Sequence, residues 1–283
     1  MTRPRGVMDF DFFKRLVDVS AGSGLFCNAE LCGVGEAYLV DDVKKYFDYA
    51  ISRYSARGIS TTIVTNGSHT TFIPEGVSHV DISFNAGRKE TYERITGLNF
   101  DKVVGNIKAI SRSGQLKDNT HIHMLVFEDN KTEIMDFVNL FKDTPARLEF
   151  SFKYENQCDA IENKTLEPFR TSKRYPCFYP LETVFVTWNG TVIPCPHDFN
   201  ASVVFGDLNE MNIDNVLTSS RRLEMIERHG KRDFSGICRD CNYNVSFRGK
   251  IFSFKADKIV SDPQENKKFR NMLRIAGLEY TGS

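Results

Sequence analysis

The sequence predicts an α/β fold in which parallel strands alternate with helices, and two observations support this prediction. Between residues 24 and 152, five short β-prone runs are separated by longer segments with helical periodicity, which is the pattern of repeated β-α units. A further helical segment, residues 9–20, precedes the first run. A chain that begins with a helix and then repeats strand and helix is expected to form a barrel or an open sheet whose first strand is absent.

The five predicted strands each end in polar loop residues, and the helices between them place apolar residues at i, i+3 and i+4. The strands are residues 24–32, 60–64, 78–84, 120–127 and 147–152, and the clearest helices are residues 41–57 and 131–141.

The pattern changes after residue 153. Residues 183–188 and 191–193 predict a hairpin, because the Asn189-Gly190 pair between them is a strong turn signal. Helices are predicted at residues 213–217, at 220–229, and from Asp262-Pro263 to Gly277. We place a boundary near residues 155–165, which divides the chain into domains of residues 1–160 and 161–283.

The composition excludes several classes of protein. The 283 residues are 41% hydrophobic and 26% charged, as in ordinary globular proteins. The 37 basic residues are balanced by 37 acidic ones, which argues against a nucleic acid or an anionic membrane as partner. No apolar run approaches the roughly 20 residues of a spanning helix, and residues 1–20 are too charged for a signal peptide. We therefore expect a cytoplasmic protein.

Seven cysteines are an odd number and too few for a disulfide framework, so they are expected to be core thiols or metal ligands. Cys27 and Cys32 lie on or at the end of the first predicted strand, where buried core thiols are favoured. Cys158 follows the last predicted strand of the first half, and it is either an incidental thiol or one that faces the cavity.

The other four cysteines have a spacing that suits a shared metal site. Cys177 and Cys195 flank the hairpin, which returns its two ends to one place, and Cys238 and Cys241 form a CxxC pair. Four thiolates can close a zinc site or hold an iron–sulfur cluster, and four unrelated buried thiols are the alternative. His197 is either a substitute ligand or a histidine outside the ligand set.

The segment from Cys177 to Cys241 resembles the shortened SPASM, or twitch, auxiliary-cluster domain of radical S-adenosylmethionine (SAM) enzymes. The matching features are C-x12-G-x4-C, the run Val-Ile-Pro-Cys195-Pro-His-Asp, the run Phe205-Gly-Asp-Leu and the closing CxxC. The further cysteines of a full SPASM domain are not found in residues 242–248. The resemblance therefore implies one auxiliary [4Fe–4S] cluster on four cysteines, most similar to the 2-deoxy-scyllo-inosamine dehydrogenase type.

The first half resembles the same family. Gly33-Val-Gly35-Glu36 is similar to its GGEP element, with alanine at 37 in place of proline, and two glycines beside a carboxylate suit a bound ammonium group. Thr65-Asn66-Gly67 resembles its TNG element, and residues 82–86 resemble its fourth-strand region. The resemblance implies that SAM is bound at the carboxyl ends of the strands by Gly33, Gly35, Glu36, Thr65, Asn66, Ser83 and Asn85.

This resemblance implies an incomplete (β/α)6-type partial TIM barrel, followed by a small hairpin–helix domain that carries the cluster. It implies SAM-dependent radical hydrogen abstraction, which oxidises an alcohol or modifies a peptide. The expected partners are a small-molecule or peptide substrate and an electron donor such as flavodoxin or ferredoxin. The catalytic residues are not identified. His121 and His123 share one strand face, either as a proton acceptor or as packing histidines.

The CxxxCxxC motif that binds the SAM-cleaving cluster of this family is not in the sequence, although it would precede residues 3–10. We expect the chain to be an amino-terminally truncated form of a longer protein, and a second [4Fe–4S] cluster only in that longer form. The alternative is a natural relative without that cluster, which would be a non-catalytic accessory or binding protein with a structural [4Fe–4S] cluster.

Overall fold

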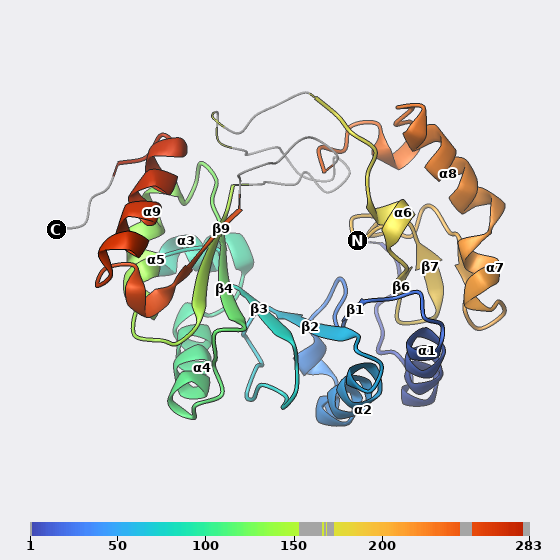
Figure 1. Cartoon of the computed structure of the whole chain (residues 1–283), viewed down its shortest axis with the longest axis horizontal. Helices are drawn as coiled ribbons and strands as arrows, with labels where there is room; N and C mark the ends of the chain where they lie inside the picture. Colours follow the sequence, from blue (N-terminus) through green and yellow to red (C-terminus); the bar gives the residue numbers. More distant parts are fainter. Residues whose placement is uncertain (1, 153–165, 167, 169–172, 244–250, 280–283) are drawn as a thin grey trace.

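The computed structural model describes residues 2–152, 166, 168, 173–243 and 251–279 (Figure 1). Cys158 lies outside the described residues, so neither interpretation of it is tested.

A six-stranded, mainly parallel sheet forms the larger part of the molecule. Its order is β1 (Asn28–Glu30), β2 (Ser60–Thr65), β3 (His79–Ser83), β4 (Thr120–Leu125), β5 (Arg147–Ser151) and β9 (Ile251–Lys255). The first five strands are parallel, and β9 joins β5 in the antiparallel sense. The predicted α/β class is confirmed. The first strand is shorter than predicted, and β9 was not predicted.

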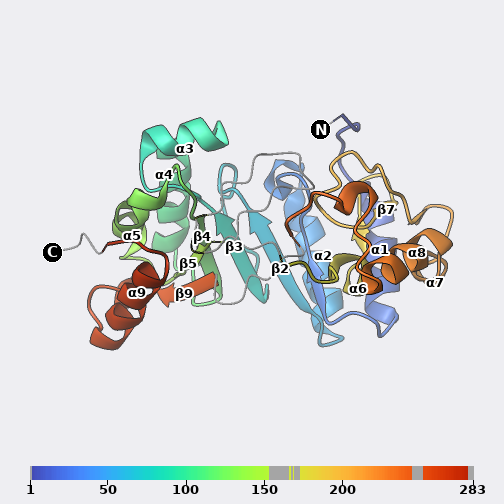
Figure 2. The ribbon, with the colours of Figure 1, turned by 90° about the horizontal axis from the view of Figure 1, so that it is seen from above.

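Helices cover the outer side of this curved sheet (Figures 1 and 2). The α-helices of this part are α1 (Phe10–Gly22), α2 (Val43–Ser55), α3 (Lys89–Thr96), α4 (Phe100–Arg112), α5 (Ile134–Phe141) and α9 (Pro263–Ile275). Short 3-10 turns occur at η1 (Ala37–Leu39), η2 (Lys131–Glu133) and η5 (Ala256–Lys258). As predicted, α9 begins after Asp262, whose side chain accepts hydrogen bonds from two backbone amides of the first turn. The helix ends before Gly277, which has φ +69°.

Buried and partly buried residues alternate along the strands, so the two faces of the sheet differ in burial. On β3, Val80 and Ile82 are fully buried in the main core beneath the helices, whereas Asp81 and its odd-numbered neighbours are only partly buried. The same alternation occurs on β4. The core therefore lies between the sheet and the helices, and the other, concave face carries polar side chains.

A smaller unit contains the hairpin and the four cysteines of the second half. It comprises α6 (Tyr179–Glu182), an antiparallel sheet of β6 (Phe185–Val186), β7 (Thr191–Ile193) and β8 (Gly206–Asp207), then α7 (Ile213–Leu217), α8 (Ser220–Gly230) and η4 (Gly236–Cys238). The predicted hairpin is confirmed. Its turn needs glycine at position 190, because φ is +93° and a Cβ there would lie 2.3 Å from Asn209 Nδ2.

The two ends of the chain each pack on the opposite half. Near the amino terminus, the Thr2 amide donates to Asn200 Oδ1 at 2.7 Å, and Trp188 Nε1 donates to the Pro4 carbonyl at 3.2 Å. Near the carboxyl terminus, β9 extends the large sheet, and Phe254 contacts both Phe150 and Phe269. The division at residue 160 stays a prediction.

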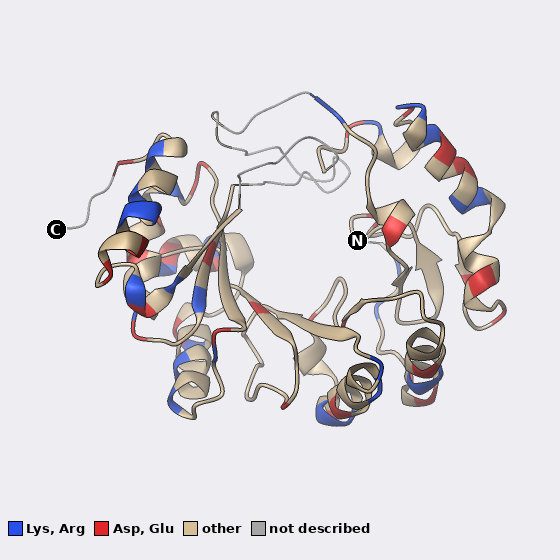
Figure 3. Ribbon diagram, in the orientation of Figure 1, with Lys and Arg blue, Asp and Glu red and all other residues tan. Residues whose placement is uncertain are grey.

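The surface carries both signs of charge on most helices, as α8 and α9 show in Figure 3. In the part of the chain that the structure describes, no helix has both the length and the apolar character needed to cross a membrane.

Candidate functional site

Glu36 is held at the carboxyl end of β2 by three donors. Its carboxylate accepts hydrogen bonds from the Asn66 amide (2.8 Å), from the Thr65 hydroxyl (2.9 Å to each oxygen) and from the Tyr38 amide (3.1 Å). The structure thus brings together Glu36, Thr65 and Asn66.

The Thr65-Asn66-Gly67 turn is braced from below. The Asn106 side chain donates to the Gly67 carbonyl at 2.9 Å, and the Gly67 amide donates to Thr65 Oγ1 at 3.1 Å. Gly67 has φ +76°, and a Cβ there would lie 2.9 Å from Val103 Cγ1. The turn therefore requires glycine both for its backbone conformation and for packing against α4.

Substitution Gly67→Ala is expected to destabilise the chain more than Gly114→Ala does. Gly114 has nearly the same φ, +74°, but no atom lies within 4 Å of the position that a Cβ would take there, so it isolates backbone strain. We expect a loss of about 1–2 kcal/mol for Gly114→Ala from the left-handed backbone. Crowding against Val103 should add about 1–3 kcal/mol for Gly67→Ala. Urea unfolding measures both losses, and equal losses would contradict the crowding argument.

The other residues assigned to SAM lie along the same edge. Gly33 and Gly35 are exposed, and a Cβ at Gly35 would meet nothing within 4 Å, so open space lies beside that backbone. Ser83 ends β3 and is half-buried. Asn85 has φ +36°, and its Oδ1 accepts from the Leu125 amide at 2.9 Å, so its side chain braces β3 against β4. These assignments stay predictions.

Four cysteines line one cavity in the second half. Cys177 precedes α6, Cys195 follows β7, and Cys238 and Cys241 lie at the end of η4. The space between them, including the part open to solvent, measures about 380 Å³. Burial, followed by the nearby thiols of the other three, raises the pKa of Cys238 to about 12. A thiol whose pKa is raised this far needs a bound cation to become a thiolate near neutral pH.

Four thiols are a donor set that suits a soft metal. Thiolates select zinc and iron–sulfur clusters over magnesium or calcium. A cavity lined by Cys177, Cys195, Cys238 and Cys241 therefore fits the four-cysteine ligation of an iron–sulfur cluster.

Arg174 fixes the CxxC turn, a role for which no motif in the sequence provides a signal. Its guanidinium donates to the carbonyls of Cys238, of Arg239 at 2.7 Å and of Cys241 at 3.2 Å. It also lies over the Phe234 ring at 4.3 Å. Because Arg174 is three residues before Cys177, these hydrogen bonds tie the Cys177 segment to the CxxC segment and place a positive charge beside the cavity.

Histidines and aromatic rings complete the wall of the cavity. His197 packs against Tyr179 and Tyr243, with ring centroids at 5.8 and 5.1 Å, so it belongs to the wall and is not a surface histidine. His229 from α8 also lines the cavity, although it was not predicted from the sequence. In the sequence, His229 is a lone histidine in the last turn of a charged helix. Many surface histidines occur in the same pattern, so the pattern does not predict a place in a cavity wall.

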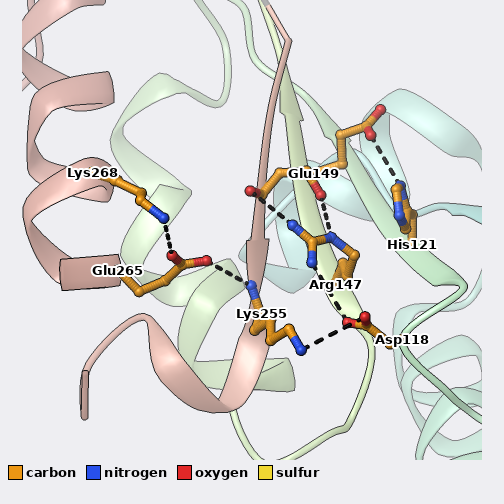
Figure 4. A network of polar contacts seen from close by, with 8 residues as sticks. Asp118, His121, Arg147, Glu149, Lys255, Glu265 and Lys268 are labelled. Atoms are coloured by element: carbon orange, nitrogen blue, oxygen red, sulfur yellow. Dashed lines mark hydrogen bonds and ion pairs between the residues drawn. The ribbon is translucent and has the colours of Figure 1, made fainter. Parts of the chain in front are cut away.

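A cluster of titratable side chains lies on the concave face of the large sheet. The strand register sets Asp81 opposite His121, and His123 opposite Glu149. His121 Nδ1 lies 3.0 Å from Glu149 Oε2, and the His79 ring meets the His121 ring edge to face at 4.4 Å. Figure 4 shows that His121 and Glu149 point toward each other from β4 and β5. His121 and His123 thus share one face, as predicted.

The pKa values of three of these groups are shifted from their ordinary values. Burial raises the pKa of Asp81, whose Oδ1 is buried and has no hydrogen-bond partner in the part of the chain that the structure describes. Burial also lowers the pKa of His79. For Glu149, burial acts upward, but the hydrogen bond from His121 and the neighbouring His123 bring the pKa below its ordinary value. A carboxylate paired with an imidazole therefore lies beside a carboxyl whose pKa is raised by burial.

Beneath this cluster, ion pairs tie β9 and α9 to the sheet. Asp118 lies 3.5 Å from Arg147 Nη1 and 3.6 Å from Lys255 Nζ, and Glu265 accepts from the Lys255 amide at 3.2 Å (Figure 4). Arg147 Nε also donates to Ser253 Oγ at 2.8 Å. These contacts hold the edge strand in register with β5.

The prediction of buried core thiols is wrong for Cys27, which is exposed because β1 begins only after it. Cys32 is partly buried, and its thiol donates to Glu30 Oε1 at 3.3 Å. Burial and the Glu30 carboxylate raise the pKa of Cys32, so it is a poor thiolate.

Comparisons with known proteins match both halves of the chain. The model of the radical SAM superfamily matches residues 3–141, and that of SPASM, an iron–sulfur cluster-binding domain, matches residues 177–242. The S-adenosyl-L-methionine-dependent 2-deoxy-scyllo-inosamine dehydrogenase of Niallia circulans is 33% identical over 84 residues, which cover 28% of this chain. The matched segment spans 32% of that enzyme, about a third of its length.

Solved structures resemble the fold over most of the chain. BtrN in complex with AdoMet and 2-DOIA has a TM-score of 0.57 at 16% identity, covering 85% of this chain and 82% of its own. Native anSMEcpe with bound AdoMet and Kp18Cys peptide has a TM-score of 0.56 at 14% identity, covering 97% and 91%. At identities this low, the likeness concerns the fold.

Proposed function

Because the chain belongs to the radical SAM superfamily and carries a SPASM domain, a family whose cofactors are iron–sulfur clusters and SAM, we propose that it serves the SAM-dependent radical oxidation of a small hydroxylated molecule. The observation that carries this proposal is the cavity lined by Cys177, Cys195, Cys238 and Cys241. The name of the Niallia circulans dehydrogenase supports an alcohol as substrate. A peptide is the second candidate, because anSMEcpe has a similar fold and was solved with a peptide.

The edge of the sheet would hold SAM. The Glu36 carboxylate would receive the ammonium group, while the Thr65 and Asn66 donors fix that carboxylate in place. At Gly35, no described atom lies within 4 Å of the position of a Cβ, which leaves space for the rest of the molecule. Ser83 and Asn85 lie at the end of the next strand, within the same edge. In the longer form that carries the CxxxCxxC segment, SAM and the cluster on that segment would supply the radical that removes a hydrogen atom from the substrate.

The concave face would receive the proton of the alcohol. Oxidation of an alcohol to a ketone removes a hydrogen atom from carbon, a proton from oxygen and one electron. When His121 donates its Nδ1–H to Glu149, its Nε2 carries a lone pair. This nitrogen would accept the hydroxyl proton of the alcohol. Asp81 Oδ1, which has no hydrogen-bond partner among the described residues, would bind a substrate hydroxyl. The four cysteines would hold the group that takes the electron, and a flavodoxin or ferredoxin would supply the reducing equivalents for SAM cleavage.

Anaerobic reconstitution of the full chain with iron and sulfide tests this proposal. We expect about four irons per chain, together with SAM binding that depends on Glu36. Bound zinc in place of iron would refute the cluster. SAM cleavage is tested with the longer form that carries the CxxxCxxC segment, under reductant and with 2-deoxy-scyllo-inosamine as the probe, and formation of a ketone would support the oxidation. Bound iron without any cleavage in that longer form would instead favour an accessory protein with a structural cluster.

Substitution Asp81→Asn is expected to stabilise the chain at neutral pH. Burial raises the pKa of Asp81 in the folded state, so the charged form costs stability above that pKa. The cost disappears as the pH falls through the raised pKa and the carboxyl takes up a proton. We expect a gain of about 1 kcal/mol, roughly 2–4 °C in Tm, that shrinks on acidification.

Thermal unfolding from about pH 8 to about pH 4 measures this gain for Asp81→Asn and for the exposed control Asp143→Asn. The control should show no such gain. A loss of stability in Asp81→Asn at every pH would mean that the carboxylate has partners in the fold and is not available to a substrate.

A further inference from the structure

His229 is buried against the four-cysteine cavity in an unusual hydrogen-bonding state. Its side chain is 2% exposed, and it lines the cavity together with Cys177, Cys195, Cys238 and Cys241. The backbone amide of Cys177 donates to His229 Nδ1 at 3.1 Å. The Nε2 atom is buried and has no hydrogen-bond partner among the described residues.

The Cys177 hydrogen bond determines where the imidazole proton lies. An Nδ1 that accepts a hydrogen bond carries no proton, so the ring is neutral and the proton is on Nε2. This places an N–H donor without an acceptor in the wall of the cavity. A buried unsatisfied donor is costly, and the sulfur atoms of a cluster held by the four cysteines would supply the acceptor.

We propose that His229 Nε2–H donates a hydrogen bond to a sulfur of the cluster that the four cysteines hold, and that this bond raises the cluster's reduction potential. The inference rests on the proposed cluster site. Reduction adds negative charge to the sulfurs, so a donor stabilises the reduced state more than the oxidised one. His229 is therefore a positioning and tuning residue: one ring nitrogen holds the backbone of a ligand and the other acts on the cluster.

Two variants separate the donor from the structural contact. In His229→Asn, the side-chain oxygen takes the place of Nδ1 and can still accept from Cys177, but nothing reaches the position of Nε2. In His229→Gln, the amide nitrogen reaches the position of Nε2, but the acceptor for Cys177 is lost. The two substitutions thus remove opposite halves of the imidazole's role.

The test is a redox titration, followed by electron paramagnetic resonance, of the reconstituted full chain. We expect His229→Asn to lower the equilibrium constant for reduction at least tenfold, which is about 59 mV for one electron. His229→Gln should stay within about threefold of the unsubstituted chain, or about 30 mV, while its Tm falls because Cys177 loses its acceptor. Exchange into D2O should reveal a coupled exchangeable proton in the unsubstituted chain and not in His229→Asn.

Unchanged potentials in His229→Asn would overturn the proposal, and equal falls in both variants would show that the histidine only supports the Cys177 loop. Iron content of the unsubstituted chain tests the cluster site separately. A chain that binds no iron overturns the site and the tuning role together, whereas normal iron content with no shift in potential overturns the tuning role alone.

Discussion

Replacing both CxxC cysteines, Cys238→Ala with Cys241→Ala, should abolish iron binding by the reconstituted chain. These two thiols are half of the four that line the cavity and would hold the cluster, and alanine has no thiol to replace them. We expect about four irons per chain to fall to nearly none. Because residues from several segments line the cavity, loss of the cluster should also lower the Tm of the chain. Iron and sulfide analysis with visible absorption measures the first effect, and calorimetry measures the second.

Cys27→Ala is the matched control, since Cys27 is exposed and does not line the four-cysteine cavity. It should retain full iron content. Iron retained by the double variant, or lost in the control, would mean that these four cysteines are not the ligand set. Zinc in the unsubstituted chain at one ion per chain would argue against a cluster altogether.

Substitution Glu36→Gln should weaken SAM binding tenfold or more. The carboxylate would receive the ammonium group, and a charge-assisted hydrogen bond of this kind contributes about 1.5–3 kcal/mol. The Asn66 and Tyr38 amides each donate to an oxygen of this side chain. In glutamine, one of these oxygens becomes an NH2 group, which cannot accept a hydrogen bond from the amide that faces it. Isothermal titration of the reconstituted chain with SAM gives the dissociation constant directly.

Glu75→Gln provides the comparison, because Glu75 is an exposed carboxylate in the loop that leads into β3, away from this edge. It should bind SAM as the unsubstituted chain does. Urea unfolding of Glu36→Gln distinguishes a lost ligand contact from a disturbed Thr65-Asn66 turn. Unchanged affinity in a folded Glu36→Gln variant would refute the role of Glu36.

Periodicity was sufficient to predict most of the fold. The strands and helices of the first half follow hydrophobic alternation that local sequence controls, so β2 to β5 lie within two residues of the predicted runs. The edge strand β9 could not be predicted, because its partner β5 lies about 100 residues earlier in the chain. A five-residue segment carries no local signal for so distant a pairing.

The candidate sites show the same limit. The spacing of Cys177, Cys195, Cys238 and Cys241 was informative because a hairpin and a CxxC bring thiols together by local geometry. Arg174 and His229 act on the cavity from outside any motif, through contacts that only the folded chain creates. Asp81 and Glu149 are ordinary acids in the sequence, and only the sheet register places them beside His121 and His123.

The crossing of the two chain ends has a consequence for cooperativity. Residues 2–6, at the start of the chain, pack on the hairpin unit of the second half. Strand β9, near the end of the chain, completes the sheet of the first half. Each half therefore includes a segment from the opposite end of the chain. No single cut yields two fragments that both keep all their own contacts. Unfolding of either half should therefore release surface in the other, and the chain should melt in one transition.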